Sequence, residues 1–183
     1  MRAIGLRRWS RDEYDSMIAA GLFAPGERVE LIDGEILTVT PQGTLHATAI
    51  RLTEDALRSS FGPGFDVRAQ LPIAADAHSE PEPDIAVVLG TARDYRDAHP
   101  TTALLIVEVA DATLDFDRQR KQILYARAGI PEYWIVNLID RCVEVYRGPG
   151  PASYRSSRKC LPGEIISPLA APGAKIAVSD ILP

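Results

Sequence analysis

Hydrophobic and polar residues alternate along the chain with two periods, one typical of helices and one typical of strands. Apolar side chains recur at three- and four-residue intervals over residues 44–59 and again over 115–129, which predicts two amphipathic helices. Ser10 followed by Glu13 is a capping-box pattern and predicts a short helix over residues 11–20. The remaining apolar runs predict strands at 28–32, 35–39, 84–89, 104–109, 132–137, 142–147, 152–158 and 175–178, with further extended chain over 65–75.

Tight turns join several of these strands. Asp33-Gly34 separates the first two, and this composition favours a two-residue hairpin turn because both positions need positive φ. Residues 138–141 separate a second pair of strands that also reads as a hairpin. Strands interleaved with helices, some of them paired through turns, predict an α/β fold with a mixed central β-sheet flanked by α-helices. Since the chain shows no internal repeat and no linker, we expect a single domain over residues 1–183.

Two acidic residues lie at the rims of two neighbouring strands. Asp84 begins one strand and Glu108 comes near the end of the next, with a polar connection between them. If the two strands pair as an antiparallel hairpin, the start of the first lies beside the end of the second, and the carboxylates meet at one edge of the sheet. Two carboxylates at close range repel each other unless a proton or a cation lies between them, and all-oxygen ligands suit a hard ion such as Mg²⁺. The sequence therefore predicts a cation site at this edge.

Lys121 is the candidate for the positive group that usually accompanies such a metal site in phosphodiester hydrolysis. It lies one turn after Asp117 and one turn before Tyr125, at the margin of the face that the predicted helix buries. The alternative is a surface lysine paired with Asp117. The residues expected on or near the buried face are Phe116, Ile123, Leu124 and Ala128.

Composition and charge narrow the class of protein. Apolar residues make up 46% of the 183 and charged residues 25%, which is typical of a globular domain with a substantial core. The formal net charge of −5 and the pI near 5.2 argue against a broad nucleic-acid footprint, although not against a local one. Two groups of basic residues are best interpreted as solvated faces: Arg118, Arg120, Lys121 and Arg127 on one helix, and Arg155, Arg158 and Lys159 nearer the C-terminus.

Cysteine and histidine are sparse. Cys142 and Cys160 are the only cysteines, which fits a reducing cytoplasm better than a disulfide scaffold, and Cys142 is expected to be a buried strand residue. No apolar run approaches the length of a membrane span, so we expect a cytoplasmic protein without a membrane partner. His78 and His99 do not have the spacing of a zinc site.

An ordered series of motifs resembles one known family. The series consists of VELIDGEI at 29–36, Thr40-Pro41 with His46, Pro83-Asp84, Glu108-Val109, and KQILYARAGIPEYWIV at 121–136. From about residue 9 to 147 the chain is similar to the Uma-two group, which is assigned to the restriction endonucleases of the PD-(D/E)xK superfamily. The resemblance implies a restriction-endonuclease-like fold with a nuclease core over about residues 28–147, followed by strands and loops over 148–183.

The resemblance also implies roles for individual residues. Asp84 and Glu108 match the acidic metal ligands of the motif, and the main-chain carbonyl of Val109 joins them as a ligand. Lys121 matches the catalytic lysine of the group. In the simplest pattern of the superfamily that lysine stands two residues after the acid, where this chain has Ala110.

Two further positions match the family with looser roles. Glu30 matches an early acidic position that adds a metal ligand directly or through water. His46 matches a histidine of the family whose role in catalysis is at most an assisting one. Without the resemblance, Glu30 is equally well interpreted as a solvated residue of a hairpin strand, and His46 as a partly buried, hydrogen-bonded residue.

The implied function is a Mg²⁺- or Mn²⁺-dependent endonuclease that hydrolyses phosphodiester bonds in DNA. Two alternatives stay open: a catalytically retired nuclease fold that serves as a DNA- or protein-binding module, and a structure-specific nuclease acting on branched or single-stranded DNA. A homodimer is plausible because a duplex has two strands to cut.

Overall fold

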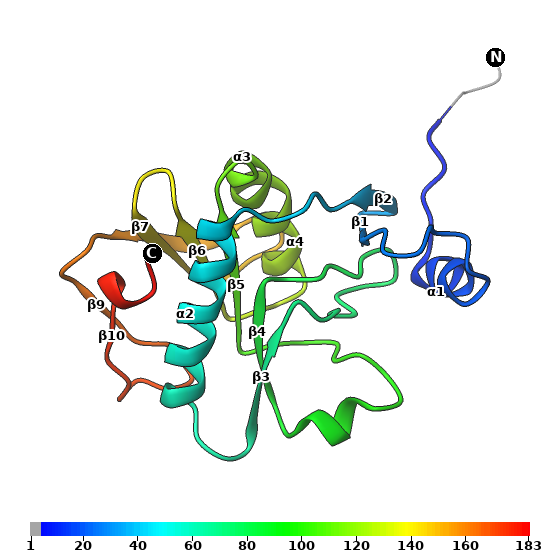
Figure 1. The fold of residues 1–183 in the computed structure, drawn as a ribbon. Coiled ribbons are helices and arrows are strands. Elements are labelled where there is room, and N and C mark those ends of the chain that lie inside the picture. The colour runs from blue at the N-terminus through cyan, green and yellow to red at the C-terminus, as the bar shows by residue number, and fades with distance from the viewer. Residues whose placement is uncertain (1–4) are drawn as a thin grey trace.

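A six-stranded mixed β-sheet forms the centre of the computed structural model, which describes residues 5–183 (Figure 1). The strand order is β3-β4-β5-β6-β7-β8, and every neighbouring pair is antiparallel except β5 and β6, which are parallel. Parallel neighbours need a long crossover, and a helical segment provides it. The strands are β3 (Phe65–Ala69), β4 (Ile85–Leu89), β5 (Leu105–Ala110), β6 (Glu132–Asn137), β7 (Cys142–Pro149) and β8 (Tyr154–Cys160).

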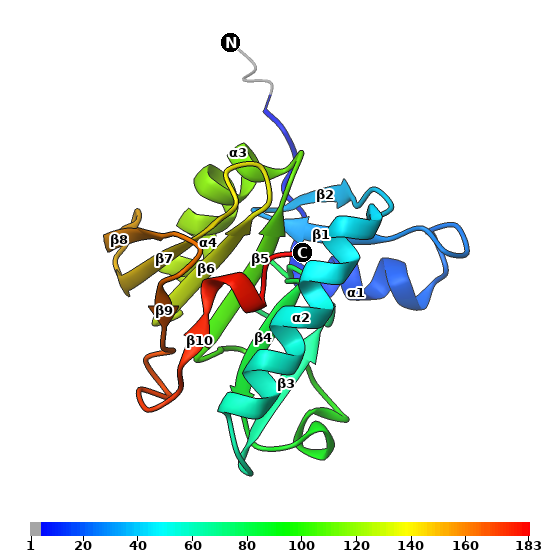
Figure 2. The same cartoon turned by 60° about the vertical axis from the view of Figure 1, so that its left-hand side comes forward.

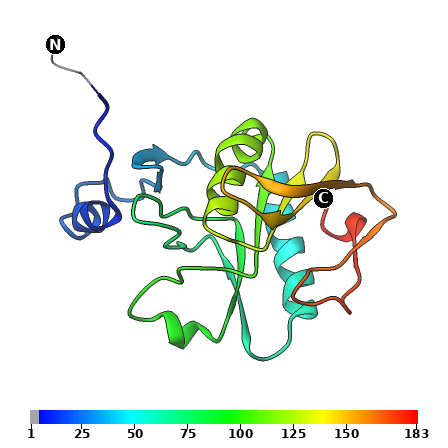
Figure 3. The ribbon, with the colours of Figure 1, turned by 180° about the vertical axis from the view of Figure 1, so that it is seen from behind.

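Helices cover both faces of this sheet. On one face, α2 (Thr44–Ser60) packs beside the C-terminal elements, as Figure 2 shows. The opposite face is covered by the crossover between β5 and β6, which can be followed from behind in Figure 3. The C-terminal elements are β9 (Ile165–Ile166), β10 (Ile176–Ala177) and η3 (Val178–Asp180), and the crossover consists of α3 (Leu114–Phe116), the π-helical turn η2 (Asp117–Lys121) and α4 (Gln122–Arg127).

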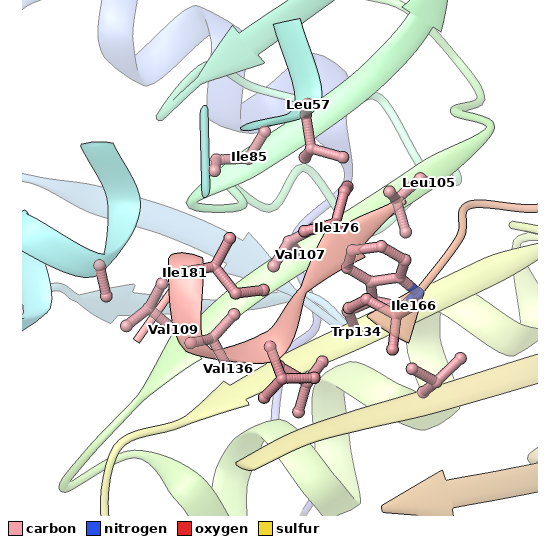
Figure 4. Packing of buried hydrophobic residues seen from close by; sticks show 14 of the residues in the cluster. Leu57, Ile85, Leu105, Val107, Val109, Trp134, Val136, Ile166, Ile176 and Ile181 are labelled. Atoms are coloured by element: carbon pink, nitrogen blue, oxygen red, sulfur yellow. The ribbon is translucent and has the colours of Figure 1, made fainter. Parts of the chain in front are cut away.

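Alternation along the strands divides the apolar side chains between two cores. The consecutive residues Tyr133 and Trp134 are both fully buried, Tyr133 in the core under α4 and Trp134 in the core under α2. In Figure 4, Trp134 and Val107 of the sheet lie with Ile176 of the C-terminal segment in the core under α2. The C-terminal elements therefore complete this core.

The N-terminal part of the described chain forms a smaller unit beside the sheet. The hairpin of β1 (Val29–Ile32) and β2 (Glu35–Thr38) turns at Asp33-Gly34, where both residues have positive φ, as predicted. Helix α1 (Arg11–Ala19) begins with the predicted capping box. The hydroxyl of Tyr14 donates a hydrogen bond to the Val29 carbonyl over 2.8 Å and ties this helix to the hairpin.

The fold class predicted from the pattern is confirmed, and several details differ. Ile123 is 41% exposed rather than on the buried face, because the turn of η2 holds one residue more than an α-helical turn and rotates the residues that follow it. Strand β8 begins two residues later than expected, and the last predicted strand has only two residues before η3. The short 3₁₀ helix η1 (Ala92–Tyr95) lies in the connection between β4 and β5. Cys142 and Cys160 are buried free thiols, and within residues 5–183 no helix is long and apolar enough to cross a membrane.

Candidate functional site

Antiparallel pairing of β4 and β5 places Asp84 beside Glu108 at the predicted edge of the sheet. Ile85 pairs with Val107, so the residues just beyond them are neighbours. The Asp84 N–H donates to Glu108 Oε2 over 3.4 Å, and the Val109 N–H donates to Asp84 Oδ2 over 2.9 Å. Both carboxylates are buried, at 7% and 3% exposed. The predicted juxtaposition of the two acids is confirmed.

Lys121 reaches the same place from the crossover. Its Nζ donates to Glu108 Oε1 over 3.1 Å and lies 3.5 Å from Glu30 Oε1. Asp117, the partner in the alternative interpretation, accepts a hydrogen bond from the Thr113 hydroxyl instead. Lys121 is 7% exposed, so it is not a surface lysine.

The π-helical turn η2 places Lys121 in the site. The turn is closed by a hydrogen bond from the Gln122 N–H to the Asp117 carbonyl, five residues back. Asp117 and Lys121, at its two ends, are both buried. Single π turns within α-helices often occur at functional sites. Such a turn has no recognised sequence signature, so the pattern of apolar residues could not have revealed it.

Glu30 and His46 also lie at this edge. Glu30 is only 6% exposed, because its strand turns Val29 and Leu31 toward a small core and Glu30 the other way. Its Oε2 accepts the main-chain N–H of Glu82 over 3.2 Å. His46 lies in the first turn of α2, and its Nε2 is 3.2 Å from Asp84 Oδ2.

Two contacts in the site were not expected from the sequence. Buried Tyr125 donates its hydroxyl proton to Glu108 Oε1 over 2.6 Å. Gln70 donates its main-chain N–H to the Asp84 carbonyl over 3.1 Å and its side-chain amide to Asp84 Oδ1 over 3.5 Å. Tyr125 follows Lys121 by one helical turn, a spacing that could have suggested its position. Gln70 has a φ of 53°, a conformation that nothing in its sequence context indicates.

Carboxylates outnumber cations in this cluster, and the pKa values reflect this excess. Burial raises the pKa of Glu108 to about 8, the charges of Asp84, Asp117 and Glu30 act in the same direction, and Lys121 opposes them. Burial raises the pKa of Asp117 to about 6, although Lys121 and Thr113 oppose the shift. The excess negative charge favours binding of a further cation.

The two basic groups of the cluster both have raised pKa values. Burial by itself would lower the pKa of Lys121, but Glu108 and the neighbouring carboxylates raise it, so the amine stays an ammonium. Burial would likewise lower the pKa of His46. The pKa is nevertheless raised, because Asp84 accepts a hydrogen bond from the imidazole and because the charges of Asp84, Asp111 and Asp117 favour the protonated ring.

The donor set fits a hard divalent cation. Asp84 Oδ2 and Glu108 Oε1 are fixed by short hydrogen bonds from Val109 and Tyr125. The other oxygen of each carboxylate has only a long contact, 3.5 Å at Asp84 Oδ1 and 3.4 Å at Glu108 Oε2, which leaves lone pairs for an ion. Carboxylate oxygens are ligands that Mg²⁺ and Mn²⁺ prefer.

A cavity of about 420 Å³ opens onto the cluster. Its floor consists of Glu30, Asp84, Glu108 and Lys121. Its lining also includes residues 37–43, which lead from β2 to α2, and residues at the start of the crossover around Phe116. A small ligand can therefore reach the carboxylates from outside.

A second group of possible metal ligands lies around the turn between β6 and β7. Asp140, Cys142 and Glu144 each offer an atom within 4.8 Å of the others. Basic side chains already neutralise this group: Arg118 donates to Glu144 over 3.1 Å, and Lys159 donates to Asp140 over 3.1 Å. The group therefore has much less need of a metal ion.

The six-stranded mixed sheet with helices on both faces defines a class, α/β proteins with a mixed central sheet. The model of the Uma2 family, described as "Putative restriction endonuclease", matches residues 11–179, and the chain belongs to this family. A crystal structure of a "putative nuclease belonging to DUF820" from Anabaena variabilis ATCC 29413 has the same fold. It matches with a TM-score of 0.72 and 18% sequence identity, covering 94% of this chain and 96% of that chain. No curated protein matches the sequence.

Proposed function

We propose that the protein is a Mg²⁺- or Mn²⁺-dependent endonuclease that hydrolyses phosphodiester bonds in DNA at the Asp84–Glu108–Lys121 cluster. The observation that carries the proposal is the meeting of two buried carboxylates from β4 and β5 with an ammonium group from η2. Membership of the Uma2 family supports the reaction class.

Asp84 and Glu108 would hold the ion through the oxygens that lack short hydrogen bonds, with the Val109 carbonyl as a further ligand and Glu30 as a ligand directly or through water. The ion supplies acidity to water and neutralises charge that develops on the phosphate. The Val109 N–H and the Tyr125 hydroxyl hold the two carboxylates in position.

Lys121 and His46 would act beside the ion. Because Lys121 stays protonated, it serves as a hydrogen-bond donor that orients the attacking water or stabilises charge on the phosphate, and not as a general base. His46 contacts Asp84 and assists by fixing the orientation of that carboxylate. Both acidic ligands are thereby oriented before substrate binds.

A retired nuclease fold that only binds DNA or protein is the alternative. The acidic net charge favours it, whereas the intact carboxylate–lysine cluster favours catalysis, since nothing about binding alone requires a buried excess of carboxylates. The cleavage test separates the two.

The test is a cleavage assay on plasmid, branched and single-stranded DNA with Mg²⁺, Mn²⁺ or EDTA. We expect metal-dependent products from the wild type and none from Asp84→Asn or Lys121→Ala. Equal nicking by all three proteins would identify a contaminant. The absence of products together with the absence of calorimetric metal binding would leave the binding-module alternative.

A further inference from the structure

The cavity above the carboxylates has a lining of two chemical kinds, charged and apolar. The floor is charged and carries the proposed metal ligands. The rest of the lining includes the apolar side chains Leu37, Val39, Pro41 and Phe116, and Leu37 lies beside Glu30 as its partner across the hairpin. Leu37 and Phe116 are half-buried and continue the core under α4 out to the cavity.

The size of the cavity matches a small ligand. Ligand pockets in proteins have volumes of about 300–1,000 Å³ and combine an apolar lining with a few placed polar groups. At about 420 Å³ this cavity lies near the lower end of that range. The proposed ligands are at most 7% exposed, so a phosphodiester must enter the cavity to reach them. A phosphate on the outside of an intact duplex, with both neighbours stacked and paired, does not enter in this way.

The charge distribution also disfavours a long duplex footprint. The basic side chains that line the cavity already have carboxylate partners: Arg28 lies 3.3 Å from Glu82, Lys121 contacts Glu108 and Glu30, and His46 contacts Asp84. Binding along a duplex needs a row of cations that neutralise successive phosphates. Within residues 5–183, the arginines and lysines without a carboxylate partner are Arg93, Arg141, Arg155 and Lys175, and none of them lines the cavity.

We propose that the cavity takes one unpaired nucleotide, with its phosphodiester on the acidic floor and its base against the apolar lining at Phe116. The substrate class is then single-stranded or flapped nucleic acid rather than intact duplex. This inference rests on the proposed function and adds a base-binding surface to it. Stacking of a base on an aromatic ring is tolerant of sequence and needs no basic groove.

The test is equilibrium binding of a fluorescently labelled 12-nucleotide strand and of its blunt duplex, with Ca²⁺ present and the ionic strength varied. We expect the strand to bind at least about tenfold more tightly than the duplex. Its affinity should fall with salt at a logarithmic slope near −1, because only one or two phosphates are neutralised. Phe116→Ala and Phe116→Leu should each weaken binding of the strand about tenfold, and Phe116→Tyr should restore it.

The variants separate base stacking from packing. Phe116→Leu keeps an apolar side chain against the core, so a purely structural role would leave its binding at the wild-type level. Ile123→Ala, on the exposed side of the same crossover, should bind both nucleic acids as the wild type does.

Each outcome bears on the inference or on the proposed function separately. Any of three results would overturn the inference: duplex binding as tight as strand binding, equal strand affinities of Phe116→Leu and the wild type, or no strand binding at all. The proposed function would still stand in these cases if Mg²⁺-dependent cleavage of duplex DNA is observed. Strand binding that depends on the ring at 116, without cleavage in any divalent metal, would support the inference and refute the endonuclease.

Discussion

Two buried glutamates on the same face of the central sheet, Glu108 and Glu144, show why the proposed metal site lies at one place and not at the other. Ile135 pairs with both of them, so they are in register two strands apart. Each contacts a basic residue of the π turn η2, Lys121 at Glu108 and Arg118 at Glu144. Glu108 and Glu144 thus have nearly the same position on their strands and the same type of ion pair.

Their surroundings differ, and the two pKa values move in opposite directions. Burial would raise the pKa of Glu144, but hydrogen bonds from Arg118, Tyr146 and Asn137 lower it below its ordinary value. Burial and neighbouring carboxylates raise the pKa of Glu108 to about 8. The comparison teaches that burial together with neighbouring acids creates the need for a further cation at Glu108, whereas hydrogen bonds from three side chains offset burial at Glu144.

The largest expected difference between the two sites is in activity. Glu108→Gln removes a proposed metal ligand, and we expect DNA cleavage to fall by about 10²–10³-fold or more. Glu144→Gln is the matched control and should keep cleavage within a few-fold of the wild type, measured below the melting temperature of each variant. Equal losses in both variants would show that the two glutamates are not functionally distinct.

The next difference is in stability. Lys121→Met leaves buried Glu108 and Glu30 without their cation, and removal of one partner of a buried ion pair costs about 3–5 kcal/mol. Since Glu108 can take up a proton, we expect a loss near the lower end, about 3 kcal/mol, in urea unfolding. Arg118→Met should cost about 1 kcal/mol, because Arg118 is partly exposed and Glu144 keeps its contacts with Tyr146 and Asn137. Equal free energies of unfolding for the two variants would contradict the assigned difference in charge balance.

The pH dependence of stability has opposite signs at the two glutamates. The folded-state pKa of Glu108 is raised from 4.5 to about 8, so the metal-free folded protein holds this proton more tightly than the unfolded chain does. The corresponding stability is present below about pH 4.5 and is lost as pH rises to about 8, by about 2–4 kcal/mol in total. Glu144 has a lowered pKa, so its contribution is lost only as pH falls below its ordinary titration range.

Unfolding free energies measured between pH 5 and 8 in EDTA check this prediction. Glu108→Gln should make the fall in stability shallower, with Asp117 and Glu80 accounting for part of the slope that is left, and Glu144→Gln should leave the slope unchanged. A wild-type profile that rises over this interval would show that Glu108 is ionised without a cation.

The smallest expected effects come from two tyrosines that donate to these glutamates. Tyr125→Phe removes the 2.6 Å hydrogen bond to Glu108 and should cost about 1–2 kcal/mol of stability and several-fold in metal affinity. Tyr146→Phe removes the 2.7 Å hydrogen bond to Glu144 and should cost about 1 kcal/mol without a change in metal affinity. Calorimetric titration with Mn²⁺ distinguishes the two variants. An unchanged metal affinity in both would show that Tyr125 does not contribute to metal binding.

The sequence predicted those parts of the fold that depend on local patterns. The Asp33-Gly34 turn and the helix of α2 follow from turn composition and from the spacing of apolar residues, whereas the sequence leaves the antiparallel hairpin of β4 and β5 as a condition, which the structure fulfils. The adjacency of Asp84 and Glu108 follows from that hairpin alone. The spacing of Lys121 on its helix made it a candidate for the site, and the family resemblance added its match to the catalytic lysine.

The remaining details depend on tertiary contacts that leave no local signal. The π turn η2 has buried Asp117 and Lys121 at its two ends, and Ile123 just after it is exposed to solvent. The spacing of Tyr125 from Lys121 indicates that it lies near the site, but nothing in the sequence indicates that its hydroxyl donates to Glu108. Glu30 comes from a hairpin outside the central sheet, so its direction depends on how that hairpin packs.

Calorimetric titration of the metal-free protein with Mn²⁺ tests the proposed site most directly. The wild type and Glu144→Gln should both release heat of binding that saturates, whereas Asp84→Asn should release none at the same concentrations. An Asp84→Asn variant that binds Mn²⁺ as the wild type does, or a wild type that binds none, would contradict the assignment of the ion to the edge shared by β4 and β5.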